Sequence, residues 1–126
     1  MRSSRGSAAV DFVLIAVPLV LLALSVLGVA LVGFARNVMF DAAVEGARFG
    51  ALADQSASAG CRRAEEIFSH ALGGAIKPKV QCESAIVGTR SVVVVSLEAA
   101  LPGLGFLPNG KSFRAVGHAT SEVQDQ

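Results

Sequence analysis

An uncharged apolar run of 24 residues, from Phe12 to Ala35, constrains the fold more than any other feature. Asp11 precedes the run, Arg36 follows it, and sixteen of its residues are Phe, Val, Leu or Ile. As an α-helix the run would be about 36 Å long, whereas the hydrocarbon core of a bilayer is about 30 Å thick. Transfer of so many large apolar side chains into lipid is strongly favourable. We therefore predict a transmembrane helix rather than the buried helix of a soluble protein.

An apolar run near an N-terminus can also be a cleaved secretory signal. The apolar core of such a signal has about 7–15 residues and is followed closely by a small-residue cleavage site. Here the run is longer, and the Ala51-Leu52-Ala53 sequence lies 16 residues beyond its end. We therefore expect the span to be retained.

The distribution of charge suggests an orientation. Arg2 and Arg5 precede the span, whereas residues 36–126 carry nine basic and nine acidic side chains. Basic residues before a first span favour a cytoplasmic N-terminus, although Arg36 and Arg48 on the other side weaken the asymmetry. We expect residues 36–126 to lie outside the cytoplasm. The net charge of +1 disfavours nucleic acid as a partner.

The region after the span has the pattern of a small α+β domain. The first helix should continue past the membrane to about Leu52, and residues 61–72 have the spacing of a short second helix. Strands are expected over residues 79–87, 91–99 and 113–122. We predict an α+β fold in which a long N-terminal transmembrane helix continues outside the membrane. It should pack on a small antiparallel β-sheet of about three strands, with one short extra helix.

The strand patterns add detail to this prediction. Val80, Cys82 and Ile86 alternate onto one face of the first strand. The Val92-Val93-Val94-Val95 run is apolar on both faces and indicates a central or covered strand. Residues 101–111 form a connection rich in Pro and Gly, and its apolar residues should dock on the core or on a neighbouring molecule. These are Leu104, Phe106 and Leu107.

Three residues on the first helix are candidates for helix packing. Pro18 lacks a backbone donor, so it should introduce a harmless kink or a weak point at which the helix can bend. Gly46 and Gly50 form a G-x-x-x-G pattern that allows another backbone to approach closely. We expect this pattern to pack on the chain's own sheet, with contact to another subunit as the alternative.

Cys61 and Cys82 are the only cysteines. Outside the cytoplasm the redox environment allows a disulfide, and a bond across this spacing would stabilise the fold by about 3 kcal/mol. Two buried thiols, or a metal site that includes His70 or His118, are the alternatives. The spacings match no zinc template, so we expect neither a metal nor another cofactor.

The chain shows no catalytic motif. His70 and His118 are not paired with a nucleophile in a known pattern, and there is no glycine-rich phosphate loop. We therefore predict a protein that is not an enzyme.

Asp11 stands at the entrance to the apolar run. It could cap the N-terminus of the helix, where the helix dipole favours a carboxylate. An ionisable group beside a span is also, by default, a candidate functional residue. The sequence around it is Gly6-Ser7-Ala8-Ala9-Val10-Asp11-Phe12 after a short basic segment.

This arrangement resembles the signal of type IV prepilins, in which a membrane peptidase cuts after the glycine. The segment Ala42-Ala43-Val44-Glu45-Gly46-Ala47-Arg48, and the ending from Gly117 to Glu122, are similar to the TadE-like family. Members of that family are minor pilins or pseudopilins of the tight-adherence (Tad) pilus. They usually carry Glu where this chain has Asp11.

The resemblance implies an organisation and a set of partners. Residues 1–6 would be a leader that prepilin peptidase removes between Gly6 and Ser7, residues 7–35 the membrane helix, and residues 36–126 the outer domain. In pilins the acidic residue is thought to pair with the N-terminal amine of a neighbouring subunit, which here gives Asp11 and Ser7. Other Tad pilins and the pilus assembly platform would be the partners.

A different function remains open at this point. An uncleaved single-pass membrane protein, whose outer domain binds a partner in the cell envelope, would have the same span and the same outer domain. Only the pilin interpretation requires Gly6 and an acidic residue five positions later.

Overall fold

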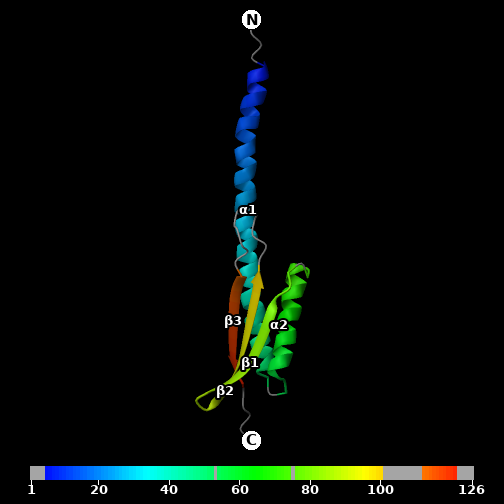
Figure 1. Ribbon diagram of the computed structural model, residues 1–126, viewed down its shortest axis with the longest axis vertical. Coiled ribbons are helices and arrows are strands. Elements are labelled where there is room, and N and C mark those ends of the chain that lie inside the picture. The colour runs from blue at the N-terminus through cyan, green and yellow to red at the C-terminus, as the bar shows by residue number, and fades with distance from the viewer. Residues whose placement is uncertain (1–4, 53, 75, 101–111, 122–126) are drawn as a thin grey trace. The chain divides into compact units, whose positions relative to one another are not determined.

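The computed structural model describes residues 5–52, 54–74, 76–100 and 112–121 (Figure 1). The elements follow one another as α1 (Arg5–Gly50), α2 (Ala57–Leu72), β1 (Lys79–Val87), β2 (Arg90–Ala100) and β3 (Ser112–Thr120). The chain divides into two units, Met1–Gly33 and Phe34–Gln126. We describe each unit by itself.

The first unit consists of the N-terminal part of α1. This helix is long and apolar enough to cross a membrane, judged by length and composition. The Phe, Val, Leu and Ile side chains of the run are exposed from Phe12 (72%) to Leu31 (58%). Pro18 lies inside the helix, which continues through it without a break.

The second unit contains the sheet. Its three strands are antiparallel in the order β1-β2-β3, so the valine-rich strand is central, as its two apolar faces predicted. A two-residue turn, Gly88-Thr89, joins β1 to β2, and Gly88 adopts a φ of 65°. This left-handed backbone conformation favours glycine.

Both helices cover the same face of the sheet (Figure 1). The largest fully buried side chains are Phe68 from α2, Met39 from α1, and Leu97 and Val95 from β2. The long apolar helix, the second helix and the three-stranded antiparallel sheet packed against the helices confirm the predicted α+β fold.

The second helix begins earlier than the predicted Cys61. Ser56 is its N-cap, and the Ser56 hydroxyl accepts a hydrogen bond from the Ala59 backbone N–H at 3.3 Å. Residues 54–60 are polar and small, a composition that predicts a loop, and glycine is a poor helix former. Here α1 packs so closely that a Cβ on Gly60 would lie 2.5 Å from the Gly46 carbonyl oxygen. Tertiary packing therefore outweighs the low helix propensity of Gly60.

The three apolar residues predicted to share one face of β1 differ in burial. Val80 and Cys82 are partly buried against the core, whereas Ile86 is 82% exposed. The last residues of β1 belong to a hairpin end whose side chains are all exposed, so strand alternation alone does not bury Ile86. The apolar residues Leu104, Phe106 and Leu107, for which docking was expected, lie outside the described residues.

Gly117 marks the closest approach between β3 and α1. A Cβ on this residue would clash with the backbone of Ala43 and Val44. The adjacent α1 positions, Ala43 and Ala47, are fully buried. Small residues on both elements therefore allow the strand and the helix to pack backbone against backbone.

Gly117→Ala should lower the free energy of unfolding of the second unit by about 1–3 kcal/mol, because the new methyl group forces β3 away from α1. Thermal denaturation followed by circular dichroism in detergent measures this loss. Gly33→Ala is the matched control, since a Cβ at Gly33 meets nothing within 4 Å. An unchanged melting temperature for Gly117→Ala would contradict the proposed close packing.

Candidate functional site

The N-terminal candidate residues lie on the first turns of α1. Gly6, Ser7 and Asp11 are all exposed, and no atom lies within 4 Å of a Cβ built on Gly6. Nothing in the described part of the chain therefore covers the Gly6–Ser7 bond. Ser7 and Asp11 are four residues apart, so they share one face of the helix.

Asp11 does not cap the helix. Because α1 begins at Arg5, Asp11 lies in the second turn, and the first turn carries no acidic residue. The dipole of the helix still favours a carboxylate near this end. Among the described residues, no hydrogen bond or ion pair involves the Asp11 carboxylate. The side chain is thus available to a cation from outside the chain.

Gly46 and Gly50 pack mainly on α2, whereas contact with the sheet was expected. A Cβ on Gly46 would lie 2.7 Å from the Ala64 Cβ atom and 2.7 Å from the Gly60 carbonyl oxygen. A Cβ on Gly50 would lie 3.2 Å from the Ser56 carbonyl oxygen, and 3.3 Å from Val93 Cγ1 on β2. The G-x-x-x-G face is therefore occupied by the chain's own second helix.

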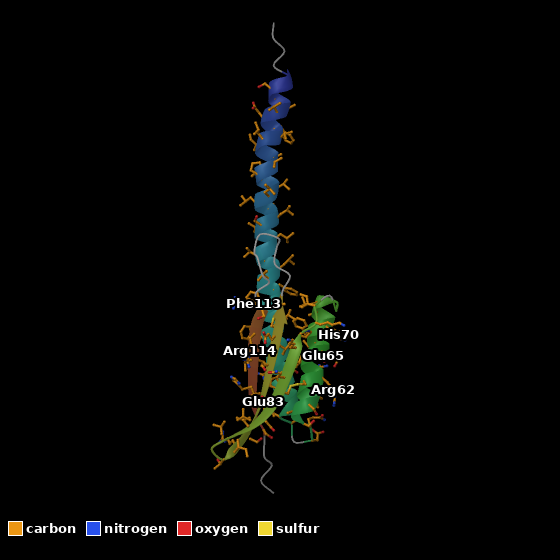
Figure 2. The ribbon with its side chains drawn as sticks, in the orientation of Figure 1. Arg62, Glu65, His70, Glu83, Phe113 and Arg114 are labelled. Atoms are coloured by element: carbon orange, nitrogen blue, oxygen red, sulfur yellow. A yellow bond between two sulfur atoms is a disulfide. The ribbon has the colours of Figure 1, made fainter. Side chains whose placement is uncertain are left out.

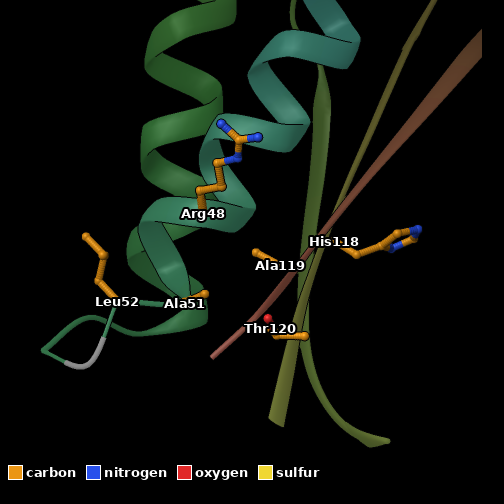
Figure 3. Close-up of a pocket in the computed structure, with 6 residues that line it drawn as sticks. All are labelled: Arg48, Ala51, Leu52, His118, Ala119 and Thr120. Atoms are coloured by element: carbon orange, nitrogen blue, oxygen red, sulfur yellow. The ribbon is translucent and has the colours of Figure 1, made fainter. Parts of the chain in front are cut away.

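The two histidines do not form a reactive centre. His70 lies near the end of α2 with Nε2 4.0 Å from the Glu66 carboxylate. An open hollow of about 500 Å³ lies between the end of α1 and β3, and its lining includes Arg48 and His118. Figure 3 shows the His118 side chain pointing away from Arg48. In the described part of the chain, no three His, Cys, Asp or Glu side chains gather as a set of metal ligands.

The sequence of the N-terminal segment is similar to a known protein family. Residues 6–48 match the model of the TadE-like protein family. Because of this similarity we call residues 6–48 the TadE-like domain. Searches of curated proteins and of solved structures each found no match. TadE-like proteins are associated with assembly of the Tad pilus and are not known as enzymes.

The bounds of the TadE-like domain decide which of the predicted residues it includes. It begins at Gly6, ends at Arg48, and contains Asp11, Pro18 and Gly46. The predicted resemblance is confirmed for this segment. The segment from Gly117 to Glu122, which also suggested the family, is not part of the match.

Sequence reasoning missed a contact between the TadE-like domain and the last strand. The Arg36 guanidinium carbon lies 5.1 Å from the centre of the Phe113 ring, a cation–π arrangement. Figure 2 shows Phe113 near the start of β3. The two residues are far apart in sequence, so spacing could not reveal the pair. The sequence offered one hint, the position of Arg36 as the first charged residue after the apolar run.

The cysteines lie outside the TadE-like domain. Cys61, on α2, and Cys82, on β1, are joined by a disulfide with their Cα atoms 5.8 Å apart. The bond links the second helix to an edge strand, and in the structure neither cysteine is a free thiol or a metal ligand. It closes a loop of the kind that stabilises small domains.

A Cys61→Ala/Cys82→Ala variant should lose about 3 kcal/mol of unfolding free energy, because the unfolded chain regains the entropy of the open loop. Thermal melts with and without a reductant measure the effect. The reductant should lower the melting temperature of the natural chain and leave that of the variant unchanged. Equal melts of the natural chain under both conditions would contradict a stabilising disulfide.

Proposed function

We propose that this chain is a minor pilin of a Tad pilus that prepilin peptidase processes after Gly6. The observation that carries the proposal is the match to the TadE-like family, which starts at Gly6 and runs directly into the apolar helix. Residues 1–6 are the leader, residues 7–35 cross the cytoplasmic membrane, and residues 36–126 lie outside. Before assembly the span holds the subunit in the membrane.

The chemistry of processing explains the acidic residue. Hydrolysis of the Gly6–Ser7 peptide bond leaves a carboxylate on the leader and a new ammonium group on Ser7. Opposite charges attract more strongly in a low-dielectric setting than in water, and an unpaired charge in lipid is costly. The Ser7 ammonium of one subunit therefore pairs with Asp11 of its neighbour, so that ordered addition to a filament is favoured over disordered contact.

Two further features support assembly as the role. Asp11 is exposed, and no described residue of its own chain pairs with it. Pro18 removes one hydrogen-bond donor from the span, so the helix has a point at which it can bend during extraction into a filament. Other Tad pilins and the assembly platform are the partners in this proposal.

Gly6→Leu should block cleavage, because a bulky side chain then occupies the position that precedes the cut. The intact mass of the membrane-extracted protein measures cleavage. The natural chain should lack Met1 to Gly6, and the variant should retain them. Gly33→Leu, a matched glycine replacement in open space, should be cleaved normally. An intact Met1 in cells with active prepilin peptidase would favour the uncleaved single-pass protein that binds an envelope partner.

Asp11→Ala should still be cleaved but should enter filaments at least about tenfold less well, since the neighbouring ammonium is left unpaired. Immunoblots of sheared pili and of membranes measure the ratio of filament-bound to membrane-bound protein. Asp11→Glu, which restores the residue usual in the family, should assemble, and Asp41→Ala should behave as the natural chain. Normal incorporation of Asp11→Ala would rule out the amine pairing.

A further inference from the structure

Four exposed cations gather at one end of the second unit. Arg36 lies on α1, Lys77 precedes β1 by two residues, Lys79 begins β1, and Arg114 lies near the start of β3. In the register of the sheet, Lys79 is opposite Glu98, and Glu98 is opposite Arg114. Adjacent strands are about 4.8 Å apart, so this row is compact. We call these four residues the cationic end.

The cationic end is present on both faces of the sheet. Phe113 stacks against Arg36, on the face that the helices cover. Arg114 is the next residue along β3, so its side chain points to the opposite face; Figure 2 labels both residues. The Phe113 ring thereby holds the Arg36 guanidinium beside the sheet, and the guanidinium donors stay available for an acceptor.

Among the described residues, carboxylates do not balance this charge. Glu98 is the acidic residue of the row, and over residues 34–52, 54–74, 76–100 and 112–121 no ion pair involves any of the four cations. The ion pairs that the structure does contain lie on α2, around Glu66. The next acidic residue on α1, Asp41, lies about 7.5 Å further along the helix.

We propose that the cationic end binds the phosphate groups of anionic phospholipids at the surface of the membrane that α1 crosses. The inference rests on the proposed span. Arg36 follows the last apolar residue of the run, Ala35, so chain continuity places its guanidinium at the depth of the headgroups. Basic residues next to a span are attracted to anionic lipid within a Debye length. An acidic protein partner would have to reach the same charges while the lipid surface is already beside them.

This contact holds the outer domain against the membrane before assembly. The lysine and arginine side chains reach the headgroup phosphates from both faces of the sheet. Lys79 and Arg114 act together because the sheet register keeps them in one row. Extraction into a filament breaks the contact.

The chain's composition allows a direct test. All three lysines, Lys77, Lys79 and Lys111, fall after the span and none falls in the leader. The full chain is labelled with ¹⁵N at the lysine side chains and reconstituted in vesicles of phosphatidylglycerol or of phosphatidylcholine. Solid-state NMR then measures dipolar dephasing between lysine nitrogen and lipid phosphorus. We expect strong dephasing, from a nitrogen–phosphorus distance of about 4 Å, in phosphatidylglycerol and a marked loss in phosphatidylcholine.

Variants assign the contact. Lys77→Gln/Lys79→Gln should lose most of the dephasing in phosphatidylglycerol. Arg62→Gln/Arg63→Gln removes the same charge from α2 and should leave the dephasing unchanged. Equal dephasing in both lipids, full dephasing in the lysine variant, or an equal loss in the arginine control would each overturn the inference.

An alkaline wash of the vesicles separates this inference from the proposed span. A chain that stays with the vesicles but shows no lipid dependence overturns the headgroup contact alone. A chain that the wash releases overturns the span, and the headgroup contact with it.

Discussion

Backbone contact between small residues is the interaction on which the second unit, residues 34–126, depends. Gly46 on α1 meets Gly60 and Ala64 on α2, and Gly117 on β3 lies against the backbone at Ala43. These approaches bring two helices and a sheet close enough for larger side chains, such as Phe68 and Met39, to be fully buried. In a domain this small, close packing of this kind supplies contact area that long side chains alone could not. Larger residues at the glycine positions would separate the layers.

The parts of the fold that local pattern determines could be predicted from the sequence. The long apolar run indicated the first helix, and the valine-rich segment indicated a central strand because both of its faces are apolar. The start of α2 and the exposure of Ile86 could not be predicted. Both depend on which distant element packs alongside, and neither helix propensity nor strand alternation contains that information.

The same distinction applies to the candidate site. Gly6 and Asp11 belong to one short segment, so their relation can be read from spacing, and the TadE-like match covers them. The partner of the G-x-x-x-G face was predicted incompletely, because the pattern indicates close approach without saying to what. The contact between Arg36 and Phe113 joins the TadE-like domain to the last strand. Only the folded arrangement reveals it.

The bond between Cys61 and Cys82 has a consequence for the history of each molecule. Both cysteines follow the apolar run, and disulfides persist in oxidising compartments but are rare in the cytosol. In the proposed orientation, with the N-terminus in the cytoplasm, the sulfurs join only after residues 36–126 have crossed the membrane. The oxidised form would then be a chemical record of export, which separates newly made subunits from those already delivered and available to a growing filament.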